Sequence, residues 1–181
     1  MLRKPAFWLL ALALAAPPAV AFAAEKIFSY DPANPQTRAY VDNGLTFIFD
    51  KGLLGFRVKE VLSTQAPAAA RVEEAGEKEL GVRLDRILPK EAYERALYRI
   101  VDEGQGPAMV RAFCPGSTKG WLVFGALRAR EDVTVHALGD DPATGKAKLC
   151  ASLAFTFRGE WTLPFRDPRQ PDAPPGMRPA R

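Results

Sequence analysis

The sequence predicts an α+β fold, in which a mainly antiparallel β-sheet packs against one amphipathic helix in a single domain with a disordered C-terminal tail. Three observations support this prediction. Apolar and polar residues alternate over several runs of strand length, for example in residues 149–157. Short, turn-rich connections separate these runs, which favours antiparallel neighbours. One segment, residues 89–103, instead carries its apolar residues at helical spacing.

The composition bounds the class of protein. The 181 residues are 48% hydrophobic, 25% charged and 10% aromatic, which is enough apolar material for one core and excludes fibrous, collagen-like and fully disordered proteins. The formal charge of +4 comes from the two ends of the chain, and residues 24–163 are neutral. Nucleic-acid-binding domains show a basic stripe or a strong positive excess, because phosphate neutralisation supplies most of their affinity. We therefore expect no nucleic-acid partner.

Residues 1–23 have the pattern of a secretory signal peptide. The basic residues Arg3 and Lys4 precede an uncharged run that ends at a proline pair. Small side chains follow at Ala21 and Ala23, the −3 and −1 positions of a cleavage site. We expect cleavage after Ala23, a periplasmic or secreted location, and a mature chain without a transmembrane segment. The alternative is an uncleaved membrane anchor, since a spanning helix needs about 20 apolar residues.

Residues 164–181 predict a disordered C-terminal tail. They are rich in proline and arginine, and repeated prolines exclude both a helix and a central strand. A tail of this kind is usually dispensable for folding. The alternative is a tether to an anionic surface or to a partner that recognises proline.

Cys114 and Cys150 are the only cysteines, and we expect them to form a structural disulfide. An oxidising compartment pairs cysteines, and no CxxC spacing indicates a redox site. Two cysteines with the single histidine, His136, make no recognisable zinc set. We therefore predict a Cys114–Cys150 bridge, no metal and no cofactor. A redox-active pair and free thiols are the alternatives.

The first half of the expected domain combines one clear hairpin with poorly patterned segments. Residues 25–43 mix apolar residues with turn signals, which predicts a short strand at most and then a loop. Alternation in residues 45–49 and 56–62, around a turn, predicts a β-hairpin. Residues 63–81 are rich in alanine and glutamate and have little to bury, so we expect an exposed helix or a mobile loop.

The expected helix spans residues 89–103. Pro89 suits its first turn, and Gly104 suits its end. At about 100° per residue, the apolar residues fall on one face, which we expect to pack on the sheet. These residues are Tyr93, Ala96, Leu97, Ile100 and Val101.

The rest of the domain predicts antiparallel strands. In the last of them, Leu149 and Ala151 alternate with Cys150, so the disulfide would lie on the less apolar face of the sheet. The four expected strands are residues 108–114, 121–128, 133–138 and 149–157.

No motif in the sequence identifies a reaction. Residues 139–146 differ from a phosphate-binding loop, which has four residues between its glycines and Ser or Thr after its lysine. Here five residues separate the glycines and Ala147 follows the lysine. Ser117 and His136 are the residues that a hydrolase would use, but neither a GxSxG nor an SxxK pattern surrounds Ser117.

The leading functional prediction is an exported, non-enzymatic protein that binds an apolar small molecule or a protein partner in the cell envelope. The aromatic-rich sheet and the lack of a catalytic motif support it, because an antiparallel sheet often leaves an apolar cleft. The alternative is a secreted hydrolase that uses Ser117 or His136. Neither the ligand nor the oligomeric state follows from the sequence. The residues expected to bind a ligand are Trp121, His136, Arg158 and Trp161.

Overall fold

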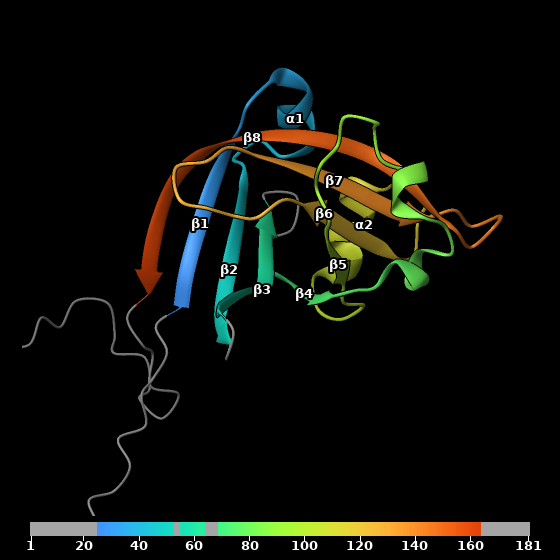
Figure 1. Cartoon of the computed structure of the whole chain (residues 1–181), viewed down its shortest axis with the longest axis horizontal. Coiled ribbons are helices and arrows are strands. Elements are labelled where there is room, and N and C mark those ends of the chain that lie inside the picture. The colour runs from blue at the N-terminus through green and yellow to red at the C-terminus, as the bar shows by residue number, and fades with distance from the viewer. Residues whose placement is uncertain (1–24, 53–54, 64–68, 164–181) are drawn as a thin grey trace, which may run out of the picture.

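The computed structural model describes residues 25–52, 55–63 and 69–163, which form a closed antiparallel β-barrel. Each strand pairs with its neighbours in chain order, and the first strand closes the barrel by pairing with the last (Figure 1). The predicted signal peptide, its cleavage site and the predicted tail lie outside the described residues. Within the described residues, no helix is long and apolar enough to cross a membrane.

The described chain consists mainly of strands, with short helices between some of them. The strands are β1 (Glu25–Pro32), β2 (Leu45–Gly52), β3 (Gly55–Ser63), β4 (Ala70–Glu74), β5 (Ala96–Ile100), β6 (Gly120–Phe124), β7 (Val133–Asp140) and β8 (Ala147–Leu163). The helices are α1 (Pro35–Tyr40), α2 (Gly106–Phe113) and two 3₁₀ turns, η1 (Glu77–Leu80) and η2 (Leu84–Arg86).

The α+β class predicted from the sequence is wrong, because the sheet closes on itself and residues 89–103 are not a helix. Within this segment, β5 directs Tyr98 and Ile100 into the barrel and Leu97 outward. Leu97 packs in a second apolar cluster, so both faces of β5 are buried. A strand that is buried on both faces loses the polar alternation that identifies it, and its apolar residues can then match helical spacing.

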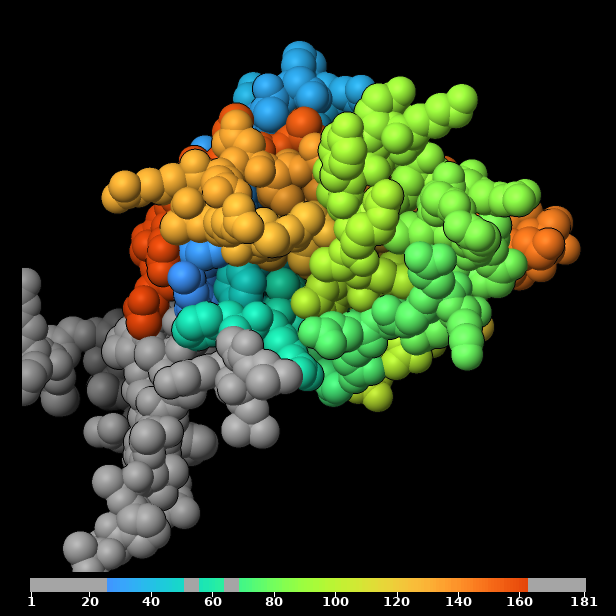
Figure 2. Space-filling model, viewed as in Figure 1, coloured from blue at the N-terminus to red at the C-terminus, as the bar shows by residue number. Residues whose placement is uncertain are grey.

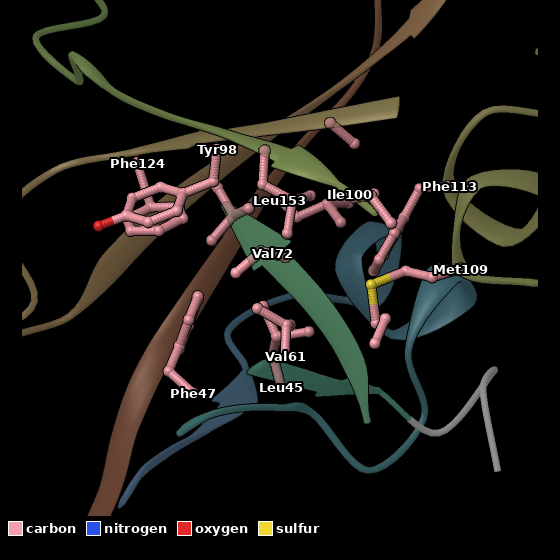
Figure 3. Close-up of a cluster of buried hydrophobic side chains, with 14 of the residues drawn as sticks. Leu45, Phe47, Val61, Val72, Tyr98, Ile100, Met109, Phe113, Phe124 and Leu153 are labelled. Carbon is pink, nitrogen blue, oxygen red and sulfur yellow. The ribbon is translucent and has the colours of Figure 1, made fainter. Parts of the chain in front are cut away.

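The amphipathic helix of this protein is α2, in a segment that the sequence predicted to be a strand. A proline lies in its first turn, which suits helix initiation. Met109, Val110 and Phe113 share one face and are buried in the barrel's main cluster. The helix therefore closes the end of the barrel at which β5 ends and β6 begins. Figure 3 shows Met109 and Phe113 at one end of this cluster, with Tyr98 and Phe124 at the other.

A smaller cluster covers the outside of β5, β6 and β7. Leucines of residues 75–95 cover Trp121, Val123 and Leu138 on the outer faces of β6 and β7. Figure 2 shows this segment, in green, spread over that side of the molecule. The leucines are Leu80, Leu84 and Leu88.

The hairpin predicted at residues 45–62 is confirmed, since β2 and β3 pair along their length. Two neighbouring segments contain more regular structure than expected. Residues 25–43 hold β1 and α1, and residues 63–81 hold β4 and η1. The side chain of Asn34 caps α1 by accepting from the backbone N–H of Thr37 at 2.8 Å, as capping residues do.

The predicted disulfide is confirmed: Cys114 and Cys150 are bonded, with their Cα atoms 5.4 Å apart. Cys114 ends α2, and Cys150 lies at a bulge in the pairing of β8 with β7. The bulge places Leu149 in the outer cluster and Ala151 in the barrel, so the expectation that these two residues share a face is wrong. The bridge ties the helix that closes the barrel to its wall, and a disulfide is consistent with a non-reducing compartment.

Asp140, at the end of β7, organises the turn that precedes β6. One carboxylate oxygen accepts from the backbone N–H groups of Thr118 and Lys119, each at 2.7 Å, and the other accepts from the Thr118 hydroxyl at 2.8 Å. Burial raises the pKa of Asp140, but these hydrogen bonds outweigh it and hold the pKa below its ordinary value. The carboxylate is therefore charged in the folded protein at neutral pH.

Replacing Asp140 by alanine is expected to lower the free energy of unfolding by about 2–3 kcal/mol at pH 7, because it removes hydrogen bonds to a charged group. The folded-state pKa of this carboxyl lies below the unfolded one. The carboxyl's contribution to the free energy of unfolding is complete above the unfolded-state pKa, and it is lost as the pH falls through the folded-state pKa. Urea denaturation of both proteins from pH 7 to pH 3 should show the difference narrowing below about pH 4. A difference that stays constant would contradict this role.

Candidate functional site

The end of the barrel opposite α2 contains a cavity of about 280 Å³. It is surrounded by the first residues of β1, β3 and β5 and by the last residues of β2 and β6, whereas α2 lies where β5 ends and β6 begins. We call it the mouth cavity. It is lined by Lys26, Phe28, Phe49, Phe56, Val58, Ala96, Tyr98, Phe124, Gly125, Ala126 and Leu127.

A continuous series of seven aromatic rings runs from the mouth cavity into the barrel and back. Consecutive ring centroids are 5.0–5.7 Å apart. All contacts are edge-to-face except that of Tyr98 with Phe124, whose planes differ by 8°. Both arrangements are favourable for aromatic pairs. In order, the rings are Phe49, Phe28, Phe157, Tyr30, Phe47, Phe124 and Tyr98.

The two ends of this series form the walls of the mouth cavity. Phe49 and Phe28 belong to one end, and Phe124 and Tyr98 belong to the other. Burial, and then the nearby Glu74 carboxylate, raise the pKa of Tyr98, so its phenol is uncharged at neutral pH. The walls are therefore apolar and flat.

Tyr30, in the middle of the series, places a polar group inside the barrel. Its hydroxyl is buried and has no hydrogen-bond partner among the residues that the structure describes. Burial, together with the carboxylates of Glu131 and Asp132, raises the pKa of Tyr30 to about 12. The phenol is thus a neutral donor, and one ring, Phe157 or Phe47, separates it from the rings that line the cavity.

Lys26 supplies the only charge among the described residues that line the mouth cavity. Its position in β1 directs it to the same side as Phe28, toward the opening. The Lys26 Nζ lies 4.6 Å from the ring centroid of Phe28 and 5.4 Å from that of Phe56. It also pairs with an oxygen of Glu160 at 3.0 Å. The rim therefore carries an ammonium held by two aromatic faces and one carboxylate.

Residues 125–132 form one side of the rim. Gly125 and Ala126 leave space, since a Cβ at Gly125 would meet no atom within 4 Å, while Leu127 packs against the barrel core. The end of the segment is fixed by Asp132, which accepts from the backbone N–H of Phe157 at 2.9 Å. Figure 2 shows these residues, in orange, beside the blue and teal strands β1 to β3.

None of the four residues expected to bind a ligand lines the mouth cavity, and they do not come together. Trp121 lies on the outer face of β6 and is 2% exposed. Trp161 lies near the end of β8, at the end of the barrel opposite to Trp121, and is 47% exposed. Arg158 pairs with Asp31 at 3.6 Å on the surface. The two tryptophans are thus near different ends of the barrel.

His136 links three elements instead of facing a cleft. It is 3% exposed, and its Nδ1 lies 2.8 Å from the Ser152 hydroxyl and its Nε2 3.2 Å from a Glu94 oxygen. Ser117 is buried and donates to the carbonyl of Asp140 at 2.7 Å. The serine beside His136 is therefore Ser152, and the hydrolase alternative stays a prediction.

A larger hollow of about 540 Å³ lies beside α2 and is bounded by Trp121. Its other walls include both cations and carboxylates, among them Arg99, Lys119 and Glu103. Arg99 is already paired with Glu73 at 2.7 Å. Because opposite charges line it side by side, this hollow favours no class of ligand.

The residues that make the mouth cavity were not identified from the sequence as a site. Their alternation in β1 to β3 indicated burial only, because a buried aromatic residue in a strand is usually core. Searches against models of known protein families, curated proteins and solved structures found no match for this chain. The site is therefore argued from its geometry.

Proposed function

We propose that this protein binds a small, ring-containing apolar molecule in the mouth cavity and does not transform it. The observation that supports this proposal best is the aromatic cavity at one end of a barrel whose other end is filled by α2. Barrels of eight strands are just wide enough to fill with side chains or to hold one small ligand. Barrel mouths are among the places where ligand sites occur.

The size of the cavity limits the ligand. About 280 Å³ lies just below the usual range of about 300–1,000 Å³ for drug-sized ligands. A molecule of one or two rings therefore suits it. The stacked pair of Tyr98 and Phe124 offers a flat face for such a ring, and offset stacking or an edge contact adds to the burial of apolar area.

The proposal includes the location predicted from the sequence. The disulfide supports a non-reducing compartment, and the expected signal peptide would deliver the protein to the periplasm or outside the cell. A carrier or a sensor of a small molecule in the cell envelope is the role that these features support.

The test is binding of 2-naphthylmethanol, an uncharged two-ring probe, to the oxidised mature protein. Backbone amide shifts in NMR spectra locate the probe, and a titration gives its Kd. The Gly125→Leu variant places a side chain in the open space at the rim and is expected to raise the Kd at least tenfold. Gly76→Leu is the matched control, because a Cβ there also meets no atom within 4 Å and Gly76 lies outside the cavity.

Thermal unfolding checks that both variants fold. Shift changes confined to residues around the mouth cavity, lost in Gly125→Leu and kept in Gly76→Leu, support the proposal. Equal affinity of the two variants, shifts centred on the hollow beside α2, or no binding by the native protein would contradict it.

A further inference from the structure

We infer that the ligand of the mouth cavity is an aromatic monocarboxylate, whose carboxylate binds the Lys26 ammonium at the rim while its ring lies between the aromatic walls. This inference rests on the proposed function, since it concerns the same cavity. It adds the charge of the ligand and the residue that selects it.

Lys26 is placed to bind a carboxylate at the rim. Among the described residues that line the cavity it is the only charged one, so a ligand beside them meets one cation among mainly apolar side chains. Its side chain is 28% exposed, which means that its charge is partly desolvated. A partly desolvated charge interacts more strongly with a ligand charge than a fully hydrated one does.

The Lys26 ammonium also has N–H donors that Glu160 does not use. A lysine side chain carries three N–H donors, and among the described residues the one ion-pair partner of Lys26 is Glu160, at 3.0 Å. Phe28 and Phe56 hold the charge by their ring faces and accept no conventional hydrogen bond. A ligand carboxylate beside Nζ therefore gains charge-assisted hydrogen bonds without displacing another acceptor.

The surrounding acidic groups compete only weakly for this place. Glu160 is 40% exposed, and exposed ion pairs contribute little, so its side chain is free to turn toward solvent. On the rim segment, Glu131 pairs with Arg128 at 3.5 Å, and Asp132 accepts from a backbone N–H of β8. Glu131 and Asp132 therefore already have partners within the rim segment and β8.

A cationic ligand is disfavoured by the same geometry. Lys26 already occupies the faces of Phe28 and Phe56, two of the aromatic rings that could otherwise hold a ligand cation at the rim. The Lys26 ammonium would repel a second cation. A neutral ring is expected to bind by stacking alone, because it gives the ammonium no new partner.

Three probes with one ring system test the inference: 2-naphthoate, 2-naphthylmethanol and 2-naphthylmethylammonium, titrated at pH 7 by calorimetry and NMR. We expect the acid to bind about tenfold more tightly than the alcohol, and the amine to bind most weakly. Added salt should reduce the advantage of the acid, since the rim is partly exposed.

Variants at the rim test whether Lys26 is the residue that binds the ligand carboxylate. Lys26→Gln should abolish the preference, raising the Kd of the acid about tenfold so that acid and alcohol bind with similar Kd values. Lys26→Arg keeps the charge and should keep the preference. Glu160→Gln removes a competing carboxylate and should lower the Kd of the acid several-fold. Lys119→Gln, beside α2, is the matched control and should change neither value.

The outcomes separate the two proposals. If none of the three probes binds, the proposed function fails. If the alcohol binds at the mouth as tightly as the acid, the proposed function stands and the inference is overturned. Tightest binding of the amine, or an unchanged preference in Lys26→Gln, also overturns it.

Discussion

Replacing Phe47 by alanine is expected to lower the free energy of unfolding by about 3–5 kcal/mol, the usual cost of removing a fully buried phenylalanine. Phe47 is 0% exposed, and its ring touches those of Tyr30 and Phe124, at centroid distances of 5.7 and 5.1 Å. It joins the two halves of the aromatic series. Truncation removes both ring contacts and leaves a cavity that barrel strands, linked on both sides, cannot close by moving together.

Urea denaturation followed by circular dichroism measures this loss. The control is Phe56→Ala, because Phe56 is 51% exposed and little of its surface has been removed from water, so its truncation is expected to cost less than about 1 kcal/mol. Since Phe47 supports Phe124, which lines the mouth cavity, the Phe47→Ala variant should also bind 2-naphthylmethanol more weakly. Similar losses of stability in the two variants would show that the series does not hold the barrel together.

Removing the disulfide is expected to have the second largest effect, a loss of about 3–4 kcal/mol in the Cys114→Ser, Cys150→Ser double variant. The bridge joins residues 36 positions apart, and a loop of this length restricts the unfolded chain by roughly that free energy. In the folded protein the bridge holds the end of α2 against β8. The loss is comparable with much of the total stability of a small domain, about 5–15 kcal/mol.

Denaturation with and without a reductant tests this prediction. Reduction should destabilise the native protein by about the same amount as the double substitution and should leave the double variant unchanged. Because the bridge lies at the end of the barrel opposite the mouth cavity, the folded double variant should bind 2-naphthylmethanol with a Kd within about twofold of the native value. A double variant as stable as the native protein would contradict the structural role of the bridge.

Local patterns predicted the parts of the fold that depend on near neighbours. The hairpin of β2 and β3 follows from period-2 alternation across a turn, and the disulfide follows from two cysteines in a chain that is expected to be exported. Neither prediction depends on which distant strands lie side by side. The same reasoning failed at β5, because Leu97 and Tyr98 are buried on opposite faces of one strand. It also failed at α2, which was expected to be a strand.

The candidate site was beyond this reasoning. Phe28 and Tyr98 lie in strands far apart in the chain and share a cavity only because the barrel closes. Lys26 looks like an ordinary surface lysine in the sequence, and it becomes the charge at the rim only because β1 begins there. Trp121 and Trp161 were both expected to bind a ligand, but they lie near opposite ends of the barrel.

Alternation and cysteine count are local signals that do not depend on topology, and they were enough to predict the β2–β3 hairpin and the Cys114–Cys150 pair. The closure of the sheet, the filling of one end by α2 and the meeting of aromatic walls at the other end are properties of the tertiary structure. These features depend on the pairing of β1 with β8. Strand alternation determines which face of a strand is buried, but it carries no information about which distant strand lies beside it.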